Sequence, residues 1–232
     1  MQKLKVLHKN SLYETVDRIN EAAFFAHAID PSEAESAADW IQSRMGAGIH
    51  YHGLFGLTPA EMDSGIFTFT GDRLQSASLR HVMAEETCRA LLFLESQGVK
   101  TGRSARQSAS EELGALIAGP GSKKMGRGFF CCGTCTVAVW RHVNAGGLQA
   151  EQPHLPAGIE ILKQHRDDQG GWRRFPFYYT LSALIEMEIP TARDELQYAG
   201  NRIRRLLKRP QKSTRFALRR MHILQKSLDI IH

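Results

Sequence analysis

The chain has 232 residues, of which 42% are hydrophobic and 23% charged, and its formal net charge is +6. This balance supplies enough apolar side chain for a sizeable core and excludes an intrinsically disordered chain. Uninterrupted apolar runs, such as residues 90–94, are far shorter than the ~20 residues of a membrane-spanning helix, so we expect no transmembrane segment.

The first residues and the cysteines indicate a cellular location. Residues 1–9 carry charge and lack the apolar segment and cleavage site of a secretory signal peptide. The four cysteines are too few for a disulfide framework in a chain of this length, and three of them are clustered. We therefore expect a cytoplasmic protein whose cysteines are free thiols.

Apolar residues recur at three- and four-residue spacing through most of the sequence, and this spacing predicts an all-α fold. In chain order, we expect helices at about residues 11–28, 31–45, 79–97, 105–118, 131–144, 156–165, 177–187, 191–208 and 213–231. Asp30 and Pro31 supply the chemistry of a helix start, and Thr58 and Glu61 have the spacing of a capping box. The one strand-like run is residues 66–70.

Glycine and proline separate the expected helices. Short connections of this kind favour antiparallel helical hairpins, because they leave no room for another arrangement. No low-complexity linker interrupts the sequence. We therefore expect a single helical domain over residues 1–232.

Residues 158–172 follow a recognisable order. The apolar face of a helix ends in polar residues, and an Asp-rich turn, Gly170, Gly171 and Trp172 follow before a new helix begins near Phe177. This order resembles the glutamine–tryptophan repeat of the squalene cyclase and protein prenyltransferase superfamily. The resemblance implies helical hairpins in a partial α/α toroid and a hydrophobic ligand, such as an isoprenoid, in a central pocket.

A second similarity concerns the segment before Trp140. Gly126 and Arg127, followed by Cys135 and an apolar helix, are similar to the Gly-Arg…Asp-x-Cys segment that enters the zinc-bearing helix of protein prenyltransferase β subunits. Gly133 stands where the aspartate ligand of that family would fall. The similarity implies zinc as a cofactor.

Aromatic rings and arginines gather after the two glycines. Rings can line a pocket for an apolar ligand or stabilise a cation, and guanidinium groups can hold a phosphate or carboxylate at its rim. The alternative is that these rings pack within the hairpin and the arginines point outward. The candidate ligand-binding residues are Trp172, Arg173, Arg174, Phe177, Tyr178 and Tyr179.

Two groups of side chains have the character of metal ligands. Cys131, Cys132 and Cys135 are three and four residues apart, so they can face one way on a helix, and thiolates suit zinc. Core packing and thiol redox chemistry are the alternatives for these cysteines. His81 and Glu85, four apart on an expected helix, form a second ligand set or an ordinary polar face. The candidate metal ligands are Cys132, Cys135, His81 and Glu85.

Positive charge is concentrated in residues 190–232, which hold eleven Lys and Arg but only three Asp and Glu. Two helical faces each carry several of these basic residues, Arg202, Arg205 and Arg209 on one and Arg215, Arg219, His222 and Lys226 on the other. These stripes can bind nucleic acid, acidic lipid or an acidic protein, although no known nucleic-acid motif accompanies them. They can equally be solvated helix faces.

Two functions follow from these patterns. The first is a pocket that binds a hydrophobic small molecule, and the residues leave open whether that molecule is transformed. The second is a helical scaffold whose basic C-terminal face binds an acidic partner or nucleic acid.

Overall fold

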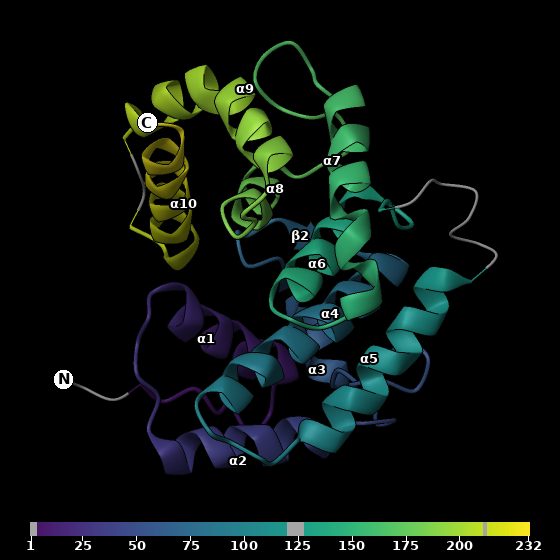
Figure 1. Cartoon of the computed structure of the whole chain (residues 1–232). Coiled ribbons are helices and arrows are strands. Elements are labelled where there is room, and N and C mark those ends of the chain that lie inside the picture. Colours follow the sequence, from purple (N-terminus) through teal and green to yellow (C-terminus); the bar gives the residue numbers. More distant parts are fainter. Residues whose placement is uncertain (1–3, 120–127, 211–212) are drawn as a thin grey trace. The chain divides into compact units, whose positions relative to one another are not determined.

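The computed structural model describes residues 4–119, 128–210 and 213–232, and Figure 1 shows that helices dominate it. Helices hold 63% of the chain, and the described residues form ten α-helices and one two-stranded sheet. The predicted all-α fold is confirmed. Among the described residues, no helix combines the length and the apolar character needed to cross a bilayer.

The chain divides into two compact units. Unit 1 comprises Met1–Ile66, Arg73–Leu116 and Ala145–Gln149, and unit 2 comprises Phe67–Asp72, Ile117–Asn144 and Ala150–His232. The single domain and the partial toroid stay predictions, and each unit is described by itself below.

Unit 1 is built from the first helices of the chain. These are α1 (Leu12–Phe24), α2 (Pro31–Gln42), α3 (Pro59–Ser64), α4 (Ser76–Ser96) and most of α5 (Arg103–Ala118). The helices α1, α2 and α4 pack against one another. The expected helix starts are confirmed, because Asp30 accepts a hydrogen bond from the Ser32 amide and Thr58 and Glu61 form a capping box.

The carboxylate of Glu61 also joins α3 to the start of α1. It is buried, and its oxygens accept hydrogen bonds from the Ser11 hydroxyl at 2.7 Å and from the backbone amides of Tyr13 at 2.7 Å and Thr58 at 2.6 Å. One side chain therefore satisfies the donors of two helix starts.

Replacing Glu61 with alanine is expected to lower the free energy of unfolding by about 2 kcal/mol, because three donors lose their acceptor. The exposed Glu35 on α2 is the matched control, and Glu35→Ala should change stability by less than about 0.5 kcal/mol. Urea unfolding followed by circular dichroism measures both. Equal losses in the two variants would contradict the role given to Glu61.

Unit 2 contains the later helices. These are α6 (Gly133–Asn144), α7 (Leu155–Gln164), α8 (Phe177–Leu184), α9 (Pro190–Leu207) and α10 (Arg215–Ile231), and a 3₁₀ helix, η2 (Gln149–His154), leads into α7. The helix α8 packs against α6, α9 and α10, and α9 packs against α7. The consecutive helices α9 and α10 pack against each other (Figure 1).

The strand-like run forms β1 (Ile66–Phe67), which pairs with β2 (Arg73–Leu74). The turn between them belongs to unit 2, where α10 holds it. Arg219 donates a hydrogen bond to the Phe69 carbonyl at 3.1 Å, and Arg220 donates one to the Thr70 carbonyl at 2.6 Å.

Candidate functional site

An open pocket of about 470 Å³ lies in unit 2 where α6 begins. Its lining joins apolar, aromatic, cationic and thiol side chains from three stretches of the chain. The lining residues are Phe129, Cys131, Cys132, Gly133, Ile161, His165 and Arg174. The pocket thus brings one predicted ligand-binding residue, Arg174, to one predicted metal ligand, Cys132.

Phe175 is not a lining residue, but it packs against two of the rings that line the pocket. Its ring lies 5.8 Å from that of Phe129, 6.0 Å from that of Trp140 and 5.5 Å from that of His165. The Trp140 indole donates a hydrogen bond to the Gly128 carbonyl at 2.8 Å. These rings therefore form a packed aromatic cluster, in which the indole nitrogen of Trp140 has a hydrogen-bond acceptor.

Gly133 allows the start of α6 to approach the segment that carries Arg174. A Cβ atom at position 133 would lie 2.2 Å from the Arg174 carbonyl oxygen, a distance that no side chain tolerates without movement of the backbone. The aspartate that the prenyltransferase similarity places here therefore does not fit. Gly126 and Arg127, which carry part of that similarity, lie outside the described residues.

Three thiols meet at the pocket. The Sγ atoms of Cys131, Cys132 and Cys135 all lie within 4.8 Å of one another, so the cluster could hold a metal ion. The helix begins at Gly133 and not at residue 131, because the backbone of Cys131 is left-handed, with φ of 55°. Cys131 is exposed, Cys132 is half-buried and Cys135 is buried.

Cys132 occupies the N-cap of α6, since its carbonyl accepts the Thr136 amide at 2.9 Å. The hydrogen bond from the Cys135 thiol, together with those from the Cys135 and Thr134 amides, lowers the pKa of Cys132 to about 5 against the cost of its burial. The same thiol–thiol hydrogen bond, with burial, raises the pKa of Cys135. Burial also raises the pKa of Cys88. Of Cys132 and Cys135, Cys132 is therefore the one that ionises to a thiolate.

The metal-free protein should show this difference in its reaction with iodoacetamide. The alkylation rate of Cys132 should change little between about pH 6 and pH 8, because its thiolate is already formed there, whereas an ordinary thiol reacts about tenfold faster per pH unit below its pKa. Peptide mass spectrometry after brief labelling measures each cysteine. Cys88 is the internal control and should stay unlabelled. A steep pH dependence at Cys132 would contradict the assignment.

Trp172 ties the turn after α7 to α9. It is buried, and its indole nitrogen donates a hydrogen bond to Glu195 at 2.7 Å. Glu195 also pairs with the Arg166 guanidinium, with the nearest nitrogen 2.7 Å from its carboxylate. This contact joins the segment between α7 and α8 to α9.

Asp167 closes the turn itself. Its carboxylate accepts the amides of Gln169 at 2.9 Å and Gly171 at 2.8 Å and pairs with Arg202 at 3.2 Å. Burial opposes ionisation of Asp167, but these amide hydrogen bonds and the Arg202 charge outweigh it and lower the pKa. The turn is thus built on an ionised carboxylate.

The aromatic residues that follow Trp172 contact arginines. The Phe177 ring lies 4.2 Å from the Arg202 guanidinium carbon, and the Tyr178 ring lies 4.8 Å from that of Arg220. Tyr179 is fully buried. Of the six predicted ligand-binding residues, Arg174 alone is among the residues that line the pocket at α6.

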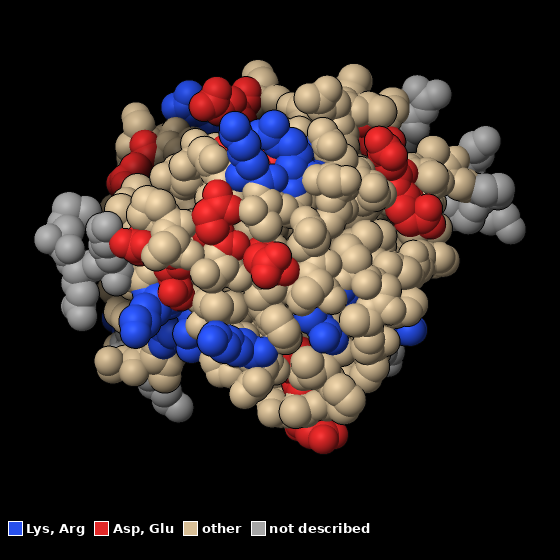
Figure 2. All heavy atoms as spheres, turned by 90° about the horizontal axis from the view of Figure 1, so that it is seen from below, with Lys and Arg blue, Asp and Glu red and all other residues tan. Residues whose placement is uncertain are grey.

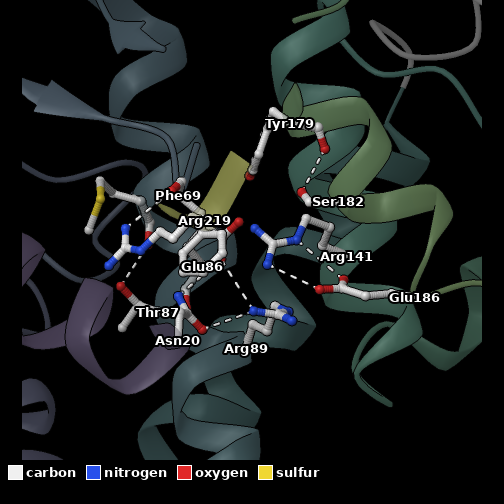
Figure 3. Close-up of polar contacts among 11 residues, drawn as sticks. Asn20, Phe69, Glu86, Thr87, Arg89, Arg141, Tyr179, Ser182, Glu186 and Arg219 are labelled. Carbon is white, nitrogen blue, oxygen red and sulfur yellow. Dashed lines mark hydrogen bonds and ion pairs between the residues drawn. The ribbon is translucent and has the colours of Figure 1, made fainter. Parts of the chain in front are cut away.

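Sequence reasoning missed a buried cation in α6. Arg141 is fully buried and directly follows the apolar residues 137–140. Its guanidinium lies 5.4 Å from the Phe69 ring and 5.3 Å from the Tyr179 ring, and it pairs with Glu186 at 3.2 Å (Figure 3). The signal was present, because an arginine beside a run of apolar residues needs a partner. In unit 1, Arg89 similarly donates to Asn20 at 3.1 Å (Figure 3).

His81 and Glu85 do meet, in unit 1. The His81 Nε2 and Glu85 Oε1 atoms are 3.0 Å apart, both side chains are buried, and the Tyr51 ring stacks on His81 at 4.9 Å. In the part of the chain that is described, the thiol cluster is the only group of three or more candidate metal ligands. His81 and Glu85 thus form a buried polar pair, and their role as metal ligands stays a prediction.

In the structure, several arginines of the two predicted basic stripes are buried or have hydrogen-bond partners. The stripe through Arg219 is wrong, because Arg219 is fully buried and its guanidinium holds the Phe69 carbonyl. Arg202 pairs with Asp167, and Arg205 donates to the Gln169 carbonyl. On the face that Figure 2 shows, Lys and Arg form separate groups with acidic residues among them.

No family model, curated protein or solved structure matches this chain.

Proposed function

We propose that unit 2 binds a small organic molecule with an apolar body and an anionic group in the pocket at the start of α6. The observation that carries this proposal is the joint lining of the pocket by apolar side chains, an imidazole and a guanidinium. Its volume of about 470 Å³ suits such a ligand. An isoprenoid diphosphate, the ligand class implied by the sequence resemblance, has this character.

Arg174 is the residue that argues for an anionic group on the ligand. Its side chain is exposed, and among the described residues no carboxylate or carbonyl pairs with its guanidinium. The neighbouring Arg173 differs, because its guanidinium donates to the Arg166 carbonyl at 3.1 Å. A guanidinium at the rim of a pocket binds phosphate or carboxylate through paired hydrogen bonds. His165 lines the same pocket and adds a second polar group.

Phe129 and Ile161 are the residues that argue for an apolar body on the ligand. Both line the pocket, and the Phe129 ring is held by Phe175 and lies 6.3 Å from His165. An apolar chain that leaves water for these side chains gains about 25 cal/mol for each Å² buried. Affinity should therefore depend on the apolar body as well as on the charge.

Binding of farnesyl diphosphate and of farnesol tests this proposal, because the two compounds differ only in the anionic group. We expect the melting temperature to rise more with the diphosphate. Arg174→Gln should weaken diphosphate binding about tenfold or more and leave farnesol binding unchanged.

Arg173→Gln is the matched control and should bind both compounds like the wild type. Titration calorimetry gives the dissociation constants. No binding of either compound, or equal losses in the two arginine variants, would contradict the proposal.

A second candidate function is zinc binding by the thiol cluster, which the mutual proximity of the three Sγ atoms favours. Cys131, Cys132 and Cys135 would hold the ion, and a fourth ligand would come from outside the cluster. When bound, zinc would supply a Lewis acid at the edge of the pocket.

Competition between the protein and a chromophoric chelator measures zinc affinity. Cys132→Ser and Cys135→Ser should each weaken binding strongly, whereas His81→Gln, in the other predicted ligand set, should not. Loss of zinc in the His81 variant alone would overturn this assignment.

A further inference from the structure

We propose that Cys132 and Cys135 form a redox-active dithiol that reduces small anionic disulfides entering the pocket at α6. This activity goes beyond ligand or zinc binding, and it belongs to the metal-free protein. Two residues separate the cysteines, at the first turn of a helix, so that their side chains meet. The Sγ atoms of Cys132 and Cys135 lie within 4.8 Å of each other, close enough for a small movement to join them in a disulfide.

The two thiols differ in access. Cys132 is half-buried and lines the pocket, whereas Cys135 is completely buried, one turn into α6, and is not among the lining residues. A substrate in the pocket can therefore reach Cys132 and not Cys135. This asymmetry matches the division between an attacking and a resolving cysteine.

The proposed reaction is a thiol–disulfide exchange that needs no cofactor. The Cys132 thiolate attacks one sulfur of the substrate disulfide, so that a mixed disulfide forms and the first substrate thiolate leaves. The Cys135 sulfur then attacks the Cys132 sulfur and gives its proton to the departing second substrate sulfur, which leaves as a thiol, while the first substrate thiolate takes a proton from water. The substrate gains two electrons and is reduced to two thiols, and the protein is oxidised to the Cys132–Cys135 disulfide. A low-molecular-weight dithiol returns the protein to its reduced form.

The pocket selects the charge of the substrate. Arg174 and His165 line it beside Cys132, and within the described residues the lining contains no carboxylate. A disulfide that bears carboxylates should therefore react faster than a cationic disulfide of similar size. Glutathione disulfide and cystamine are the two probes.

The experiment uses the reduced full-length protein in the presence of a metal chelator. With glutathione disulfide, we expect rapid formation of a Cys132–Cys135 disulfide, which peptide mass spectrometry maps. Cys135→Ser should stop at a stable mixed disulfide between Cys132 and glutathione. Cys132→Ser should form neither species, and Cys131→Ser should still form the Cys132–Cys135 disulfide.

Charge reversal tests the substrate class. Arg174→Glu should slow oxidation by glutathione disulfide and speed oxidation by cystamine, so that the ratio of the two rates falls at least about tenfold. Arg173→Glu should lower that ratio much less.

The wild-type reaction alone can overturn the proposal. It fails if the oxidised protein carries a Cys131–Cys132 disulfide or an intermolecular disulfide, or if Cys132 reacts no faster than an unstructured peptide thiol. An unchanged rate ratio in Arg174→Glu overturns the anionic substrate class. Farnesyl diphosphate binding needs no thiol, so its presence or absence is a separate result.

Discussion

Replacing Glu195 with alanine is expected to lower the free energy of unfolding by about 3–5 kcal/mol. The carboxylate of Glu195 is buried and accepts hydrogen bonds from the Trp172 indole and from the Arg166 guanidinium. Its removal leaves a buried indole N–H without an acceptor and a cation without its partner. The turn between α7 and α8 would also lose this contact with α9, while the pair between Asp167 and Arg202 remains.

The neighbouring residue gives a matched control. Asp194 is exposed on the same turn of α9, so Asp194→Ala should change stability by less than about 0.5 kcal/mol. Glu195→Gln keeps an acceptor for Trp172 but loses the charge that pairs with Arg166, and its stability should be intermediate. Chemical unfolding measures all three. A loss below about 1 kcal/mol in Glu195→Ala would contradict the role of this carboxylate.

Replacing Gly133 with aspartate is expected to destabilise the protein by about 3 kcal/mol and to abolish ligand binding in the pocket. The new Cβ would lie 2.2 Å from the backbone carbonyl of Arg174, so the start of α6 and the Arg174 segment must separate. Gly133→Ala should show most of the same loss, because the clash comes from Cβ.

Gly114, within α5, is the control for this substitution. A Cβ there would meet only the Leu148 side chain, at an ordinary 3.8 Å, and Gly114→Ala should be neutral or stabilising by up to about 1 kcal/mol. Thermal unfolding and farnesyl diphosphate titration measure both variants. If Gly133→Asp folds normally and binds zinc more tightly, the aspartate of the prenyltransferase pattern fits after all.

Local signals predicted most of the helices. The starts of α1 and α2 lie at the expected residues, because Ser11 and Asp30 cap the backbone through their own side chains. Such contacts involve residues two or three apart, and the sequence displays them directly. The start of α6 differs because Cys131 adopts a left-handed backbone, which helical periodicity does not reveal.

The candidate site depends on contacts between distant residues, and so only its parts were predictable. Cys132 and Arg174 were each identified, but as members of separate sites. Their proximity follows from the close backbone approach at Gly133, and a lone glycine in a sequence does not indicate its neighbour. Glu195 was missed for the same reason, because the Trp172 indole that it binds lies on a different segment.

Protection of Cys132 from alkylation tests most directly whether the pocket at α6 binds ligand. Metal-free protein is labelled briefly with iodoacetamide, with and without saturating farnesyl diphosphate, and each cysteine is quantified by mass spectrometry. We predict several-fold slower labelling of Cys132 with the ligand present, and clearly weaker protection in Arg174→Gln at the same ligand concentration. Ligand that binds with full affinity while Cys132 is labelled at an unchanged rate would show that the binding site lies elsewhere.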